Sequence, residues 1–107
     1  MDKNRLILYK TPQGNIKVEV LFENETFWLS QKRMAELFGV EVSAINKHLT
    51  NIYDNHELDK NSTISKMEIV QKEGNKNVNR KIEFYSLAAI LAVGYRVNSD
   101  QARNFKK

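Results

Sequence analysis

The side chains with the most specific hydrogen-bonding chemistry lie between residues 43 and 50. Asn46 can form two parallel hydrogen bonds with the major-groove edge of adenine, and Lys47 can donate to guanine or to a phosphate. Ser43 and Thr50 carry hydroxyls that can bond either a base or the nucleic-acid backbone. Alternatively, each of these four residues lies on a solvated helix face and contacts only water. Their position in the fold distinguishes the two interpretations.

The segment around them has the spacing of a helix-turn-helix, in which two short helices pack at a steep angle. Ser30 is placed to cap the first helix, the small Ala35 allows the second helix to approach, and Gly39 allows the turn. The shared apolar contact is expected from Met34, Phe38, Val40, Ile45 and Leu49. In a DNA-binding motif the second helix enters the major groove. Gln31 and Lys32 would then lie beside a phosphate, because free amides at a helix start and a cation both favour an anion.

A long, basic β-hairpin is predicted after the motif. Residues 66–81 contain five basic and two acidic side chains and alternate apolar with polar positions on both sides of a turn-rich stretch, residues 73–77. This pattern resembles the wing of a winged helix, whose phosphate-contacting candidates are Lys72, Lys76, Arg80 and Lys81. The alternative is an exposed hairpin that lysines keep soluble and protect from edge-to-edge pairing.

These elements predict one α+β domain over residues 1–107 with a winged-helix-like order. An antiparallel β meander spans 1–29, the helix-turn-helix 30–53, a polar loop 54–62, the hairpin wing 64–85 and two helices 86–107. Ser86 is expected to cap the first of these two helices, Leu87–Val93, which is apolar nearly all round, should be buried and could supply a homodimer interface. Gly94 should end it, and Asn98 or Ser99 should cap the second. That helical pattern stops at Lys107, which predicts that the chain is part of a longer protein.

Composition excludes several other functions. The chain has no Cys, which excludes disulfides, thiolate metal sites and cysteine catalysis. His48 and His56 are eight residues apart with no other ligand pattern, and no catalytic motif occurs, so we expect no enzyme, no metal, no cofactor and no small-molecule substrate. The net charge is +4, and the excess lies in the last third of the chain. No apolar run is long enough to span a membrane and no signal peptide is evident, so we expect a cytoplasmic protein.

With these residues in view, the chain resembles the RhuM family of virulence-island and prophage-associated proteins. The resemblance rests on the strings Thr26–Gln31, Met34–Gly39, Ile45–Leu49, Asn61-Ser62, Tyr85–Leu87, Ala89-Ile90 and Val93–Ser99. It implies a relationship to the amino-terminal domains of phage antirepressors, a DNA-binding role, and a position at the front of a longer protein. Glu41 and Val42 depart from the basic or polar character expected there.

Three hypotheses follow, in this order. The first is a non-enzymatic domain that binds double-stranded DNA, acting as a transcriptional regulator or antirepressor-like protein of mobile-element origin. The second is a protein–protein interaction module, which the near-neutral helix-turn-helix region and Glu41 favour. The third is a targeting domain for an enzyme encoded beyond Lys107.

Overall fold

The strands form one antiparallel, curled sheet. The computed structural model describes residues 5–10, 17–23 and 25–97. The strand order is β1-β2-β3-β5-β4, and every neighbouring pair is antiparallel. The strands are β1 (Arg5–Lys10), β2 (Lys17–Glu23), β3 (Thr26–Leu29), β4 (Ile64–Glu73) and β5 (Lys76–Ser86). The β3–β5 pairing joins the amino-terminal meander to the hairpin, so the two regions predicted as strands share one sheet, and this confirms the α+β class.

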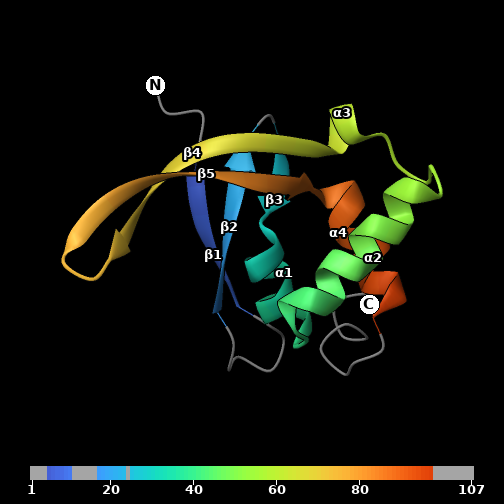
Figure 1. Cartoon of the computed structure of the whole chain (residues 1–107), viewed down its shortest axis with the longest axis horizontal. Coiled ribbons are helices and arrows are strands. Elements are labelled where there is room, and N and C mark those ends of the chain that lie inside the picture. Colours follow the sequence, from blue (N-terminus) through green and yellow to red (C-terminus); the bar gives the residue numbers. More distant parts are fainter. Residues whose placement is uncertain (1–4, 11–16, 24, 98–107) are drawn as a thin grey trace.

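Four helices accompany the sheet: α1 (Gln31–Phe38), α2 (Val42–Asp54), the single turn α3 (Lys60–Thr63) and α4 (Leu87–Arg96). Figure 1 shows α1, α2 and α4 gathered at one end of the molecule, while the β4–β5 hairpin projects away from them. The main core fills the space between these helices and the sheet, and Met34, Phe38 and Ile45 are fully buried in it. A second, smaller core of Leu21, Trp28, Met67 and Phe84 lies apart from it.

The two helices expected over residues 30–53 are present as α1 and α2, which pack against each other, while the winged-helix arrangement stays a prediction. The hydroxyl oxygen of Ser30 accepts a hydrogen bond from the Arg33 amide at 3.2 Å, which caps α1 as predicted. Gly39 ends α1 with φ of 70°, in the left-handed region that favours glycine. Ile45 and Leu49 of α2 are buried against α1, and this burial leaves the opposite side of α2 facing outward.

The hairpin predicted over 64–85 is also confirmed, and it extends to Ser86. Glu73 of β4 lies directly opposite Lys76 of β5, so the turn between them consists of two residues, Gly74 and Asn75. Gly74 has φ of 63° while Asn75 does not have positive φ, the pattern of a type II′ turn. Two strands of this length carry the tip well beyond the body of the domain (Figure 1).

Three expectations are wrong in detail. The polar segment 54–62 is not all loop, because Asp59 caps α3 by accepting from the Ser62 amide. Gly94 does not end the following helix; it is buried inside α4, which continues to Arg96. The helix is also not buried all round, since only one of its sides packs against the domain and Leu91 and Tyr95 are 39% and 67% exposed.

Ser86 occupies the cap position of α4 as predicted, but its buried hydroxyl forms no cap hydrogen bond. The second carboxy-terminal helix, expected from Asn98 or Ser99, lies outside the described residues.

Candidate nucleic-acid interface

The outward side of α2 carries the four residues singled out for base contact. Ser43, Asn46, Lys47 and Thr50 are all exposed. Their spacing of three, four and seven residues places them on one stripe of the helix, opposite buried Ile45 and Leu49. The structure therefore brings these four side chains together on one face. Asn51 is also exposed and lies four residues after Lys47, so it extends the stripe, although the sequence did not single it out.

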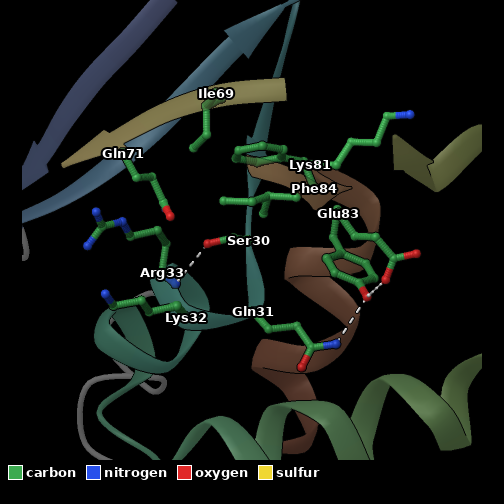
Figure 2. A pocket seen from close by; sticks show the side chains of 11 residues that line it. Ser30, Gln31, Lys32, Arg33, Ile69, Gln71, Lys81, Glu83 and Phe84 are labelled. Atoms are coloured by element: carbon green, nitrogen blue, oxygen red, sulfur yellow. Dashed lines mark hydrogen bonds between the residues drawn. The ribbon is translucent and has the colours of Figure 1, made fainter. Parts of the chain in front are cut away.

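A cleft of about 420 Å³ separates the start of α1 from the hairpin. Lys32 lines it from α1 and Lys81 lines it from β5, and Figure 2 shows their ammonium groups extending from opposite sides of the cleft. The first turn of α1 opens towards the same space, and helix amides at this position favour an anion. Arg33, which pairs with Glu36, and the carboxylate of Glu83 also line the cleft, so its walls carry more positive than negative charge. Lys32 and Lys81, on opposite sides, are suited to two successive phosphates rather than to one small ligand.

The four basic residues predicted on the hairpin do not share one face. Cross-strand register places Lys76 and Arg80 on the side of Glu73, and Lys72 and Lys81 on the other side. Arg80 donates from Nε and Nη2 to the two carboxylate oxygens of Glu73 at 2.8 and 2.7 Å. This pairing lowers the pKa of Glu73 and raises that of Arg80. The three lysines are thus better placed than Arg80 to meet a phosphate.

Gln31 has a different setting from the one predicted for it. Its amide nitrogen donates to the hydroxyl of Tyr85 at 3.0 Å, and its amide oxygen accepts from Asn46 at 3.3 Å. Tyr85 in turn donates to Glu83 at 3.4 Å. Figure 2 shows the Gln31 side chain turned away from Lys32. Sequence reasoning missed Tyr85 and Glu83, because their approach to α1 depends on the pairing of β3 with β5.

His48 lies on α2 next to this stripe and is partly buried. Burial lowers its pKa, and the positive charges of Arg96 and Lys47 lower it further. Arg96 is itself paired with Glu57. The folded state therefore favours neutral His48 more than the unfolded chain does.

The pKa of His48 in the folded protein lies below its ordinary value of 6.5. Neutral His48 therefore contributes to the stability of the folded state above that pH. The contribution is lost as pH falls through the folded pKa. We expect the urea midpoint to drop as the pH falls below the ordinary histidine pKa of 6.5, and His48→Gln to flatten that drop. His56→Asn is the matched control, because His56 is exposed and has φ of 57°, which asparagine tolerates. An unchanged pH profile in His48→Gln would contradict the assignment.

Within the residues that the structure describes, no group of side chains is arranged to hold a metal ion. In the same residues, no helix has the length and apolar character needed to cross a membrane.

Residues 62–107 match the model of the virulence protein RhuM family. This confirms the resemblance over the part of the chain that begins in α3 and includes β4, β5 and α4. The matched region contains the hairpin lysines but not the helix-turn-helix, so the family match does not bear on the α2 stripe. No curated protein and no solved structure matches the chain.

Proposed function

We propose that this RhuM-like chain binds double-stranded DNA without enzymatic activity, with α2 as the recognition helix. One observation carries the proposal: the exposed stripe of α2 lies beside the cationic cleft at the start of α1. Ser43, Asn46, Lys47 and Thr50 supply donors and acceptors for base edges, while Lys32 and Lys81 supply charge for the phosphates.

The dimensions of the elements support this division of roles. The thirteen residues of α2 give a helix of roughly 20 Å, and the major groove, about 12 Å wide, admits one such helix. The projecting hairpin acts as a wing in this arrangement, with Lys72, on the same side as Lys81, reaching a phosphate beyond the groove that α2 occupies. Glu41 precedes α2, and its carboxylate repels phosphate. This repulsion disfavours sequence-independent binding of the DNA backbone at the start of the helix.

The biological role that fits is regulation. A domain that reads bases can act by occupying a site. We propose that it is a transcriptional regulator or an antirepressor-like protein of mobile-element origin.

The experiment is a fluorescence-anisotropy titration of a labelled random duplex at several salt concentrations. Three phosphate contacts, from Lys32 and from Lys72 and Lys81 on one side of the hairpin, predict a slope of log K against log salt of about −2.7. The matched single strand should bind more weakly, because a groove-fitting helix needs a duplex. Absence of duplex binding at low salt would refute the proposal.

A second candidate is a protein–protein interaction module, and one observation favours it. Leu87, Leu91 and Tyr95 of α4 form an exposed apolar stripe, with exposures of 36%, 39% and 67%. Such a stripe is typical of a surface that a partner or a second copy covers. A pull-down after nuclease treatment that recovers one stoichiometric protein supports this candidate, and recovery that disappears with nuclease contradicts it.

A further inference from the structure

We infer that Gln31, Tyr85 and Glu83 are positioning residues that decide which atoms Asn46 presents to a base, and thereby select adenine. The inference rests on the proposed binding of DNA. The observation is a chain of hydrogen bonds that links the exposed side of α2 to the hairpin. Asn46 donates to Gln31 at 3.3 Å, Gln31 donates to Tyr85 at 3.0 Å, and Tyr85 donates to Glu83 at 3.4 Å.

The carboxylate at the end gives this chain its direction. The hydroxyl of Tyr85 donates its single proton to the Glu83 side chain. The phenolic oxygen then accepts from Gln31, which turns the amide nitrogen of Gln31 towards Tyr85 and its oxygen towards Asn46. Burial raises the pKa of Tyr85, so the phenol keeps its proton throughout the neutral range. If the side-chain amide of either Gln31 or Asn46 alone were rotated by half a turn, two donors or two acceptors would face each other.

The chain is anchored in the core at one end. Tyr85 is only 4% exposed, and its strand position is fixed by pairing with Leu29 on one side and Ile64 on the other. Gln31 follows Leu29 by two residues, so the sheet register itself brings it beside the hydroxyl. Asn46 is exposed, and an exposed side chain of this kind samples several rotamers unless a partner holds it.

The held orientation suits adenine. Asn46 gives one amide N–H to Gln31 and retains its second N–H and its Oδ1 for a ligand. These are the donor and the acceptor that adenine requires at N7 and N6. The Asn46 side chain is therefore oriented before DNA arrives. The conformational entropy of ordering this side chain is already lost in the free protein, so its loss does not reduce the affinity for DNA.

The test selects preferred duplexes from a randomised library with the wild-type domain and with variants. Asn46→Ala first identifies the base pair that this residue reads. Tyr85→Phe removes the hydroxyl, and Gln31→Met keeps the length without a donor or acceptor. Each should reduce the adenine preference at that pair about fivefold to tenfold, the lower end of what a bidentate pair discriminates. Affinity for a random duplex should stay within about twofold, since phosphate contacts remain.

Tyr53→Phe is the matched control. Tyr53 is also buried, at 8% exposure, and its hydroxyl bonds Thr63 at 2.8 Å, outside the chain from Asn46 to Glu83. This variant loses the same atom from the same kind of site and should keep the adenine preference. The side-chain amide resonances of Asn46 give a readout without DNA: they should shift in Tyr85→Phe and not in Tyr53→Phe.

Three results would overturn the inference. If Tyr85→Phe and Gln31→Met both keep the wild-type preference, the positioning role is wrong while DNA binding stands. If Asn46→Ala alters no position of the selected site, Asn46 does not read a base. If the wild-type domain binds no duplex, the proposed function fails, and the inference fails with it.

Discussion

Replacing Lys32 and Lys81 together by alanine should weaken binding of a random duplex about 60-fold at 0.1 M salt, because each phosphate contact contributes a factor of about eight there. The slope of log K against log salt should become shallower by about 1.8, which corresponds to two lost contacts. Both lysines line the cleft beside the start of α1, and neither is buried, so the fold should survive the change. Anisotropy titrations at several salt concentrations measure both quantities.

A charge-matched control separates this cleft from general electrostatic attraction. Arg80→Ala/Arg96→Ala removes the same charge from two positions that do not line the cleft and whose guanidinium groups already pair with carboxylates. It should weaken binding less than about fivefold, through long-range attraction alone. Equal losses in the two double variants would mean that the cleft is not a phosphate contact.

The second large effect concerns stability. Phe38 is fully buried in the main core at the end of α1, so Phe38→Ala should lower the free energy of unfolding by about 3–5 kcal/mol. Domains of this size are stable by only about 5–15 kcal/mol, so the loss is a large fraction of the total. Urea unfolding followed by circular dichroism gives the value.

Val42→Ala provides the comparison, since Val42 begins α2 and is 44% exposed. Removing apolar atoms from that surface should change the free energy of unfolding by less than about 0.5 kcal/mol. A small loss in Phe38→Ala, similar to that of Val42→Ala, would show that the space between α1 and the rest of the core is not packed as described.

Local signals in the sequence were sufficient to predict the two helices α1 and α2. The cap at Ser30 and the left-handed residue at Gly39 act within one turn of α1, so the bounds of this helix follow from neighbouring residues alone. The same is true of the α2 stripe, because helical periodicity separates Ile45 and Leu49 from the outward side.

Contacts between residues distant in sequence were not predictable in this way. The approach of Tyr85 to Gln31 requires β3 to pair with β5, across more than fifty residues, and no local pattern specifies that register. Gly94 looked like a helix end, but its burial within α4 overrides the local preference of glycine. The pairing of Arg80 with Glu73 likewise forms only when the hairpin is folded. Because of it, Arg80 is less available for a phosphate than the other basic residues predicted on the hairpin.

Contact of α2 and the adjoining cleft with DNA can be measured residue by residue, from backbone amide shifts during a titration with duplex DNA. We expect the largest changes at Ser43 to Asn51 of α2, at Gln31 and Lys32, and along the lysines of the hairpin, with little change at Leu91 and Tyr95 of α4. Changes confined to the α4 stripe, or none at all at low salt, would contradict contact of α2 with DNA.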